Sequence, residues 1–151
     1  MNEKLEMIRK ICDSTKHKNP LRDILLECRR GQPEIVCLCG STRFWKTFQE
    51  INLRETRAGK IVLSIGAATA SDAEHLASGA ITDEDKQRFD ELHRRKIDIA
   101  NQVLVLNVGG YIGESTRQEI DYAHSIGVPV NYLIPLDVME RIVFKYQTGK
   151  E

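Results

Sequence analysis

The sequence predicts an α/β domain with a doubly wound, mainly parallel sheet, preceded by an N-terminal helical extension. Short apolar runs, typical of buried strands, alternate along the chain with longer segments of helical periodicity. Strands that alternate with helices are joined by right-handed crossovers, which make a sheet parallel. The 151 residues suffice for one domain with a full hydrophobic core.

We assign residues 1–30 to the extension and residues 31–151 to the α/β domain. In the extension, apolar residues recur at spacings of three and four, as on amphipathic helices, and Pro20 interrupts the pattern. We expect these helices to cover the core or a partner subunit.

The α/β domain contains four predicted strands and four predicted helices. In the second of these helices, Phe89, Leu92 and Lys96/Ile97 recur at helical spacing. The loop 67–83 is long for a compact domain, which indicates a lid or binding loop or, equally, disorder. The strands are predicted at 34–40, 60–66, 102–110 and 128–135, and the helices at 41–59, 84–100, 114–127 and 136–149.

The composition argues against several classes of protein, among them nucleic-acid-binding and membrane proteins. The 22 basic and 22 acidic residues cancel, so we expect neither polymeric nucleic acid nor a membrane surface as a partner. No apolar stretch approaches the ~20 residues of a membrane span. Four cysteines without a C-x-x-C pair, and the lack of a signal peptide, predict a reduced, cytoplasmic protein with structural thiols.

No metal site is expected. Cys37 and Cys39 lie in one apolar run, and we predict that they face opposite sides of a strand. The four histidines lack the spacing of a metal-binding pair, and no zinc-type Cys/His cluster is present. We therefore expect neither a metal nor another cofactor.

Candidate binding residues follow the first two strands, because open parallel sheets bind ligands beyond the carboxyl ends of their strands. After the first strand, "CGSTR" offers Gly40 for close backbone approach, Ser41 or Thr42 for a ligand hydroxyl or phosphate, and Arg43 as a forked donor. The alternative is that Ser41 is only an N-cap and Arg43 a surface charge. "SIGAA" ends the second strand and adds Ser64 and Gly66.

The third strand ends in "NVGGYIGEST", whose glycines permit a tight turn over a ligand. Ser115 and Thr116 stand at the next helix start. Glu119 has two interpretations. Thr116 and Glu119 fit a T-x-x-E capping box, as Ser115 and Gln118 fit an S-x-x-Q box, and this pattern alone favours capping. A carboxylate near this edge is also well placed as a nucleophile or base. His93, on the preceding helix, is interpreted as a surface histidine or as part of the same edge.

These segments together resemble the nucleoside 2-deoxyribosyltransferase superfamily, which includes nucleotide N-glycoside hydrolases. The resemblance covers residues 35–133 and rests on "CGSTR", "IANQVLVLN" and the Gly-rich turn that leads to "EIDYAHSIGVPV". It implies a flavodoxin-like, Rossmann-like fold and a homodimer or higher homo-oligomer. Glu119, followed by Ala123, matches the position of the family's catalytic glutamate. That carboxylate attacks the anomeric carbon and expels the base, and water or a second base resolves the glycosyl-enzyme.

The resemblance also implies roles around the pocket. Gly40, Ser41 and Arg43 line the sugar or phosphate side, and Gly113, Ser115 and Thr116 supply donors to it, while Tyr111 flanks the pocket or belongs to the core. At two positions where the family carries an acidic residue, this sequence departs from the family's pattern. One is replaced near His93, and for the other Asn107 and Glu114 are imperfect candidates.

The sequence thus predicts an enzyme that cleaves the N-glycosidic bond of a small nucleoside or nucleoside monophosphate, by hydrolysis or base transfer. The alternative is a non-catalytic nucleotide-binding or sensing module.

Overall fold

A four-stranded parallel sheet forms the centre of the protein. The computed structural model describes residues 2–13, 19–66 and 71–138. The strand order is β2-β1-β3-β4, and every neighbouring pair is parallel. The predicted α/β class is confirmed, and the order equals the first four strands of the flavodoxin-like sheet. The strands are β1 (Ile35–Cys39), β2 (Ile61–Leu63), β3 (Gln102–Val105) and β4 (Val130–Tyr132).

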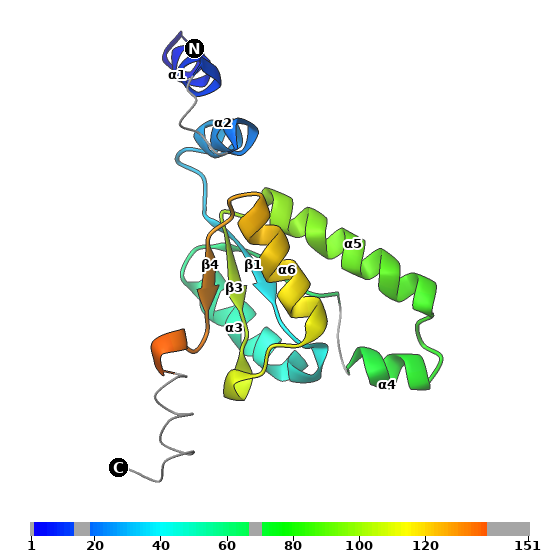
Figure 1. Ribbon diagram of the computed structural model, residues 1–151. Coiled ribbons are helices and arrows are strands. Elements are labelled where there is room, and N and C mark those ends of the chain that lie inside the picture. Colours follow the sequence, from blue (N-terminus) through cyan, green and yellow to red (C-terminus); the bar gives the residue numbers. More distant parts are fainter. Residues whose placement is uncertain (1, 14–18, 67–70, 139–151) are drawn as a thin grey trace.

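Helices cover both faces of the sheet (Figure 1). α3 (Trp45–Arg57), which follows the short 3-10 helix η1 (Thr42–Phe44), lies on one face, and α5 (Asp83–Ile99) and α6 (Glu114–Ser125) lie on the other. Because successive strand residues point to opposite faces, the strands contribute to two cores. The α3 core contains Val36, Leu38, Phe48, Ile51, Leu104 and Leu106, and the α5/α6 core includes Cys37, Cys39, Ile97, Val103, Val105, Ile120 and Ala123.

Helix α5 extends past the sheet. Its carboxyl-terminal part is packed, and Ile97 is fully buried. Phe89 and Leu92, which share the helical spacing of Ile97 in the sequence, are 50% and 53% exposed. Phe89 does not reach the core, because the amino-terminal part of α5 projects away from the sheet together with α4 (Asp72–Ala77) (Figure 1). Leu92 is exposed although the next residue, His93, is buried, so Leu92 lies on another side of the helix.

The segment before α5 is structured wherever it is described. Residues 67–70 of the predicted loop lie outside the described part of the chain. Beyond them, Ser71 begins α4 with a capping box to Glu74, and Thr82 begins α5 with a capping box to Asp85. Two capped helix starts in close succession account for order in this stretch, so disorder is the wrong interpretation of residues 71–83.

The N-terminal helices α1 (Asn2–Asp13) and α2 (Pro20–Cys28) lie at the amino edge of the sheet (Figure 1). Side chains of this segment bind backbone carbonyls there. Asn19 donates to the carbonyl of Ile126 at 3.0 Å, and the buried Arg22 donates to that of Asn101 at 3.0 Å. The extension therefore covers the edge opposite the strand ends that carry the predicted site.

Two further predictions concern the ends of the chain and the membrane. From residue 139 onward, the predicted closing helix lies outside the described residues. No helix in the described ranges is long and apolar enough to cross a membrane.

Candidate functional site

The turn after β1 is shaped by packing. A Cβ at Gly40 would lie 3.1 Å from the Cβ of Leu106 and 3.4 Å from the ring of Phe48. Glycine at this position therefore allows the ends of β1 and β3 to pack closely, a role that the prediction of a ligand contact did not anticipate. Ser41 precedes η1, but its hydroxyl makes no capping hydrogen bond, and α3 is preceded by Phe44. Ser41 therefore occupies the N-cap position of η1, as the alternative interpretation had it, but its side chain caps neither η1 nor α3.

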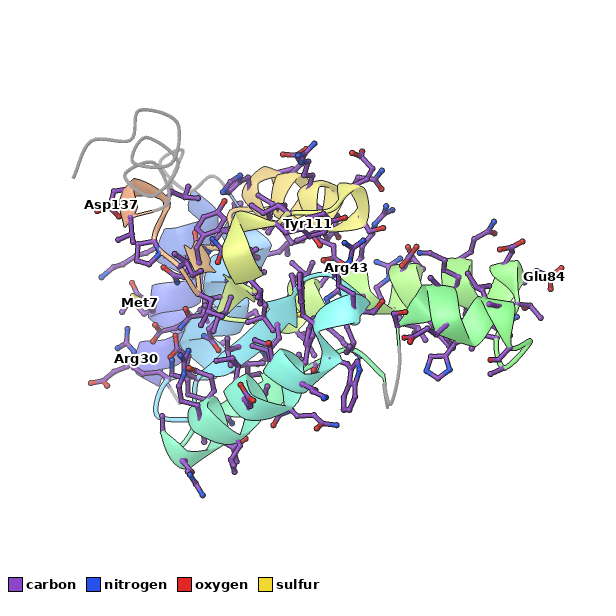
Figure 2. All side chains as sticks on the ribbon, turned by 90° about the horizontal axis from the view of Figure 1, so that it is seen from below. Met7, Arg30, Arg43, Glu84, Tyr111 and Asp137 are labelled. Atoms are coloured by element: carbon purple, nitrogen blue, oxygen red, sulfur yellow. The ribbon has the colours of Figure 1, made fainter. Side chains whose placement is uncertain are left out.

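Arg43 and Tyr111 join the turns that follow β1 and β3. The guanidinium carbon of Arg43 lies 4.3 Å from the centre of the Tyr111 ring, and Phe44 meets the same ring edge-on at 6.0 Å. Tyr111 is 41% exposed, so it does not belong to the core. A Cβ at Gly113 would lie 3.3 Å from the Tyr111 hydroxyl, so Gly113 makes room for the ring. Figure 2 labels Arg43 and Tyr111 at this edge.

Helix α6 does not use Glu119 as a cap. The helix begins at Glu114, and the preceding Gly113 makes no side-chain capping bond. Glu119 therefore lies in the second turn, where the backbone N–H groups already have helical partners. Both predicted capping boxes are wrong, because the helix starts before Ser115 and Thr116. Thr116 is buried and Ser115 is exposed.

Glu119 points toward the sheet and meets His93 of α5. Its Oε1 lies 3.7 Å from Nε2 of His93, and the two side chains are only 16% and 7% exposed. The Oε2 atom is buried and has no hydrogen-bond partner among the described residues. The prediction of a surface histidine is wrong, since the face of α5 that carries His93 packs against β1.

Two cysteines of β1 complete this cluster. Sγ of Cys39 lies 3.4 Å from Nε2 of His93, and Sγ of Cys37 lies 3.8 Å from the same atom. The prediction that these cysteines face opposite sides is wrong. Side chains in a strand alternate with a period of two, so residues 37 and 39 share a face. Together with Glu119 they form what we call the cysteine–histidine cluster: Cys37, Cys39, His93 and Glu119.

Burial and mutual contact shift the pKa values of the cluster. A hydrogen bond with Cys39 lowers the pKa of Cys37 to about 6, against the opposing effect of burial. The same bond, burial and the charge of Glu119 raise the pKa of Cys39 well above its usual value. Burial lowers the pKa of His93, but the contact with Cys37 and the charges of Cys37 and Glu119 outweigh it, so the net shift is upward.

Burial also raises the pKa of Glu119, and the positive charge of His93 opposes this rise without cancelling it. The cluster thus favours a thiolate on Cys37 beside a protonated His93. Perturbed titratable groups that converge at the carboxyl edge of a sheet mark this place as a candidate functional site.

Sequence reasoning missed the residues that flank His93 on α5. Asp90 lies one turn earlier, and its negative charge raises the pKa of Glu119. It also pairs with Lys86 at 2.9 Å. Lys96, one turn after His93, donates to the backbone carbonyl of Ser64 at 2.5 Å. The spacing of three in Asp90, His93 and Lys96 was the available signal, because it places all three on one helical face.

Other predicted positions have separate roles. The amide of Asn107 is buried, donates to the backbone carbonyl of Ile134 at 2.8 Å and accepts from its N–H at 2.9 Å. Asn107 therefore holds the segment after β4. Glu114 is exposed and accepts from Gln118 at 3.4 Å, so it does not take part in the cluster.

The structure thus separates the predicted residues into two groups. Glu119 and His93 meet inside the cluster. Arg43, Tyr111 and Gly113 meet at the surface above the strand ends, and Ser64 is joined to α5 through Lys96, whereas Gly66 is exposed. A hollow of about 340 Å³ on α1, lined by Glu3, Glu6, Met7 and Lys10, includes none of these residues.

Comparisons with models of protein families, with curated proteins and with solved structures found no match to this chain.

Proposed function

We propose that this protein cleaves the N-glycosidic bond of a small nucleoside or nucleoside monophosphate, with Glu119 as the nucleophile. The observation that carries the proposal is the position of this carboxylate. It lies in the second turn of α6, takes no part in capping, faces His93, and has one buried oxygen without a partner among the described residues. A carboxylate held in this way is available to react.

The chemistry follows that of retaining glycoside cleavage. An oxygen of Glu119 forms a bond to the anomeric carbon while the bond from that carbon to the base nitrogen breaks, and the base leaves with the electron pair. Water, or a second base, then displaces Glu119 and restores the carboxylate. A protonated His93 at 3.7 Å favours the ionised carboxylate that the attack requires.

The surroundings suit a monophosphate. Arg43 is exposed beside Tyr111 and supplies a positive charge at the same edge. The first backbone N–H groups of α6 favour an anion, since no side chain caps this helix. A ligand that lies across both turns would contact Arg43 with its phosphate and Tyr111 with its sugar or base. The homodimer implied by the resemblance remains a prediction.

One observation favours the alternative, a nucleotide-binding or sensing module. The net pKa shift of Glu119 is upward, and a protonated carboxyl group is a poor nucleophile. A protein of this kind would hold the ligand at the two turns without breaking it.

The test is chromatographic detection of free base after incubation with pooled nucleosides and nucleoside monophosphates. The Glu119→Gln variant keeps the shape of the side chain but removes the nucleophile, and we expect base release to fall at least about a hundredfold. Glu114→Gln, which changes an exposed glutamate of the same helix, is the matched control and should retain activity. If neither wild type nor variant releases base while both show ligand-dependent thermal stabilisation, the binding module replaces the enzyme.

A further inference from the structure

We propose that Cys37, Cys39 and His93 form a binding site for a thiophilic divalent metal ion, best matched by Zn²⁺, with Glu119 facing the fourth coordination position. No metal was expected from the spacing of cysteines and histidines in the sequence. The proposal does not rest on glycosidase activity and is argued from the donor atoms alone.

The distances between the donor atoms fit one ion. Nε2 of His93 lies 3.4 Å from Sγ of Cys39 and 3.8 Å from Sγ of Cys37, and the three donors all lie within 4.8 Å of one another. With Zn–S bonds of about 2.3 Å and Zn–N bonds of about 2.0–2.1 Å, two ligands of a tetrahedral ion are roughly 3.5–3.8 Å apart. The two distances from His93 already match within a few tenths of an ångström, and the two sulfur atoms, which lie within 4.8 Å of each other, would approach by at most about 1 Å.

The chemistry of the donors selects the ion. Two thiolates and an imidazole suit Zn²⁺ and other thiophilic ions, whereas Mg²⁺ and Ca²⁺ require oxygen ligands. Three protein ligands of the Cys₂His type are also a known set for zinc that keeps a fourth position open. Oε1 of Glu119 lies 3.7 Å from Nε2 of His93, so the carboxylate lies next to that position.

The Glu119 carboxyl group interacts with Cys39 and His93, but its Oε2 is buried without a hydrogen-bond partner among the described residues, which favours a cation beside it. Buried polar atoms nearly always have a partner, and an exception requires an explanation such as an absent ion. A cation bound at the three donors would be adjacent to this carboxylate and would compensate its charge.

The charges balance when the site is filled. On binding, the ion displaces one proton from the Cys39 thiol and one from the His93 imidazolium, so Zn²⁺ with two thiolates and a neutral imidazole carries no net charge. Glu119 adds one negative charge, and Lys96 is close enough to act electrostatically on both Cys37 and His93. A near-neutral group of this kind is compatible with the burial of all three donors, each at most 6% exposed.

The protein backbone holds the donors ready for an ion. Cys37 and Cys39 belong to β1, which is hydrogen-bonded to β2 on one side and β3 on the other. His93 lies in the long helix α5, which packs on the same face. The competing explanation is a metal-free set of thiol–imidazole hydrogen bonds, which would produce similar distances.

The first measurement is a Co²⁺ titration of full-length protein that has been reduced and treated with a chelator. We expect one equivalent of Co²⁺ to produce the near-ultraviolet charge-transfer absorption of thiolate ligation, and Zn²⁺ to abolish it by displacement. Zn²⁺, but not Mg²⁺, should raise the midpoint of thermal unfolding. Absence of both the absorption and the thermal shift in the wild type would overturn the proposal.

Variants then identify the donors. Cys37→Ser, Cys39→Ser and His93→Gln should each weaken Zn²⁺ binding by at least about tenfold. The double variant Cys12→Ser/Cys28→Ser leaves only the two strand thiols of the four cysteines and should bind as the wild type does. If a serine variant does not fold, by circular dichroism, Cys37→Ala replaces it. Thiolate absorption that persists in the strand variants and disappears in the double variant contradicts the proposal.

Base release measured on the same metal-free and Zn²⁺-loaded samples keeps the two proposals apart. Metal binding without base release in either sample supports the site and removes the glycosidase. Base release without metal binding does the reverse.

Discussion

Replacing Glu119 with glutamine should stabilise the metal-free protein at neutral pH. The folded state raises the pKa of this carboxyl through burial, which means that folding favours its uncharged form. Its Oε2 is buried without a partner among the described residues. Glutamine also has a polar tip but carries no charge, so the variant no longer buries an ionised carboxylate, and a buried polar group without compensation costs about 1–3 kcal/mol, more when it is charged. Because His93 lies 3.7 Å away and the side chain is 16% exposed, part of this cost is offset, and we expect Glu119→Gln to gain about 1 kcal/mol.

The gain should depend on pH in a defined direction. The folded-state pKa of Glu119 lies above its ordinary value of 4.5, so the cost is fully present only above the folded-state pKa. As the pH falls through that pKa, the folded wild type takes up the proton, and the difference between wild type and variant shrinks. The gain at neutral pH corresponds to roughly 2–4 °C in the unfolding midpoint of a domain of this size.

Urea denaturation of chelator-treated wild type, Glu119→Gln and the control Glu114→Gln, at about pH 7 and about pH 4, measures both effects. Glu114 is exposed in the first turn of α6, so its variant should lose at most about 0.3–1 kcal/mol at neutral pH, a change opposite in sign to that expected for Glu119→Gln. A Glu119→Gln variant that is less stable than the wild type at neutral pH would refute the reasoning, because the carboxylate would then contribute to folding.

Two further substitutions test the packing around the strand ends. Gly40→Ala places a methyl group 3.1 Å from the nearest side chain and should lower the free energy of unfolding by about 1–3 kcal/mol. Gly66→Ala, where nothing lies within 4 Å, should cost less, and equal losses would contradict the packing argument. Asn107→Leu removes both hydrogen bonds to the backbone of Ile134 and should cost about 1–3 kcal/mol in the same denaturation assay. The control is Asn131→Leu, at an exposed position. If it lowers the free energy of unfolding as much as Asn107→Leu does, the hydrogen bonds of Asn107 do not explain the loss.

The two central strands, β1 and β3, were predictable because a buried parallel strand is a continuous apolar run. The edge strands β2 and β4 are partly exposed, and their short, mainly apolar runs between helical segments indicated them. Boundaries were less accurate. The third strand was predicted to reach residue 110, but it ends at Val105 and is followed by the 3-10 turn η2 (Val108–Gly110). Gly109, with φ of +59°, turns the chain there, and apolar character alone does not reveal a change of backbone direction.

At the candidate site, the predictions from the sequence were wrong for two different reasons. The shared face of Cys37 and Cys39 follows from the period of a strand and could have been predicted. The burial of His93 could not be derived from spacing alone, because Phe89, His93 and Ile97 recur every four residues on one face of α5 and yet Phe89 is exposed. Which residues of a helix are buried depends on how far the helix extends past the sheet, and the periodicity of the sequence does not reveal that distance. The glycosidase function remains a prediction.

The separation of the cluster residues along the chain has a consequence for dynamics. His93 is 56 residues from Cys37 and 54 from Cys39. Such contacts form only after large loops have closed, so the cluster depends on tertiary structure and not on any local segment. Two of the four cluster residues come from β1, which is paired on both sides, and His93 comes from a helix whose amino-terminal part projects away from the sheet. A local opening of α5 alone would therefore dismantle the site while the sheet stays folded, and hydrogen exchange in α5 would report how often that happens.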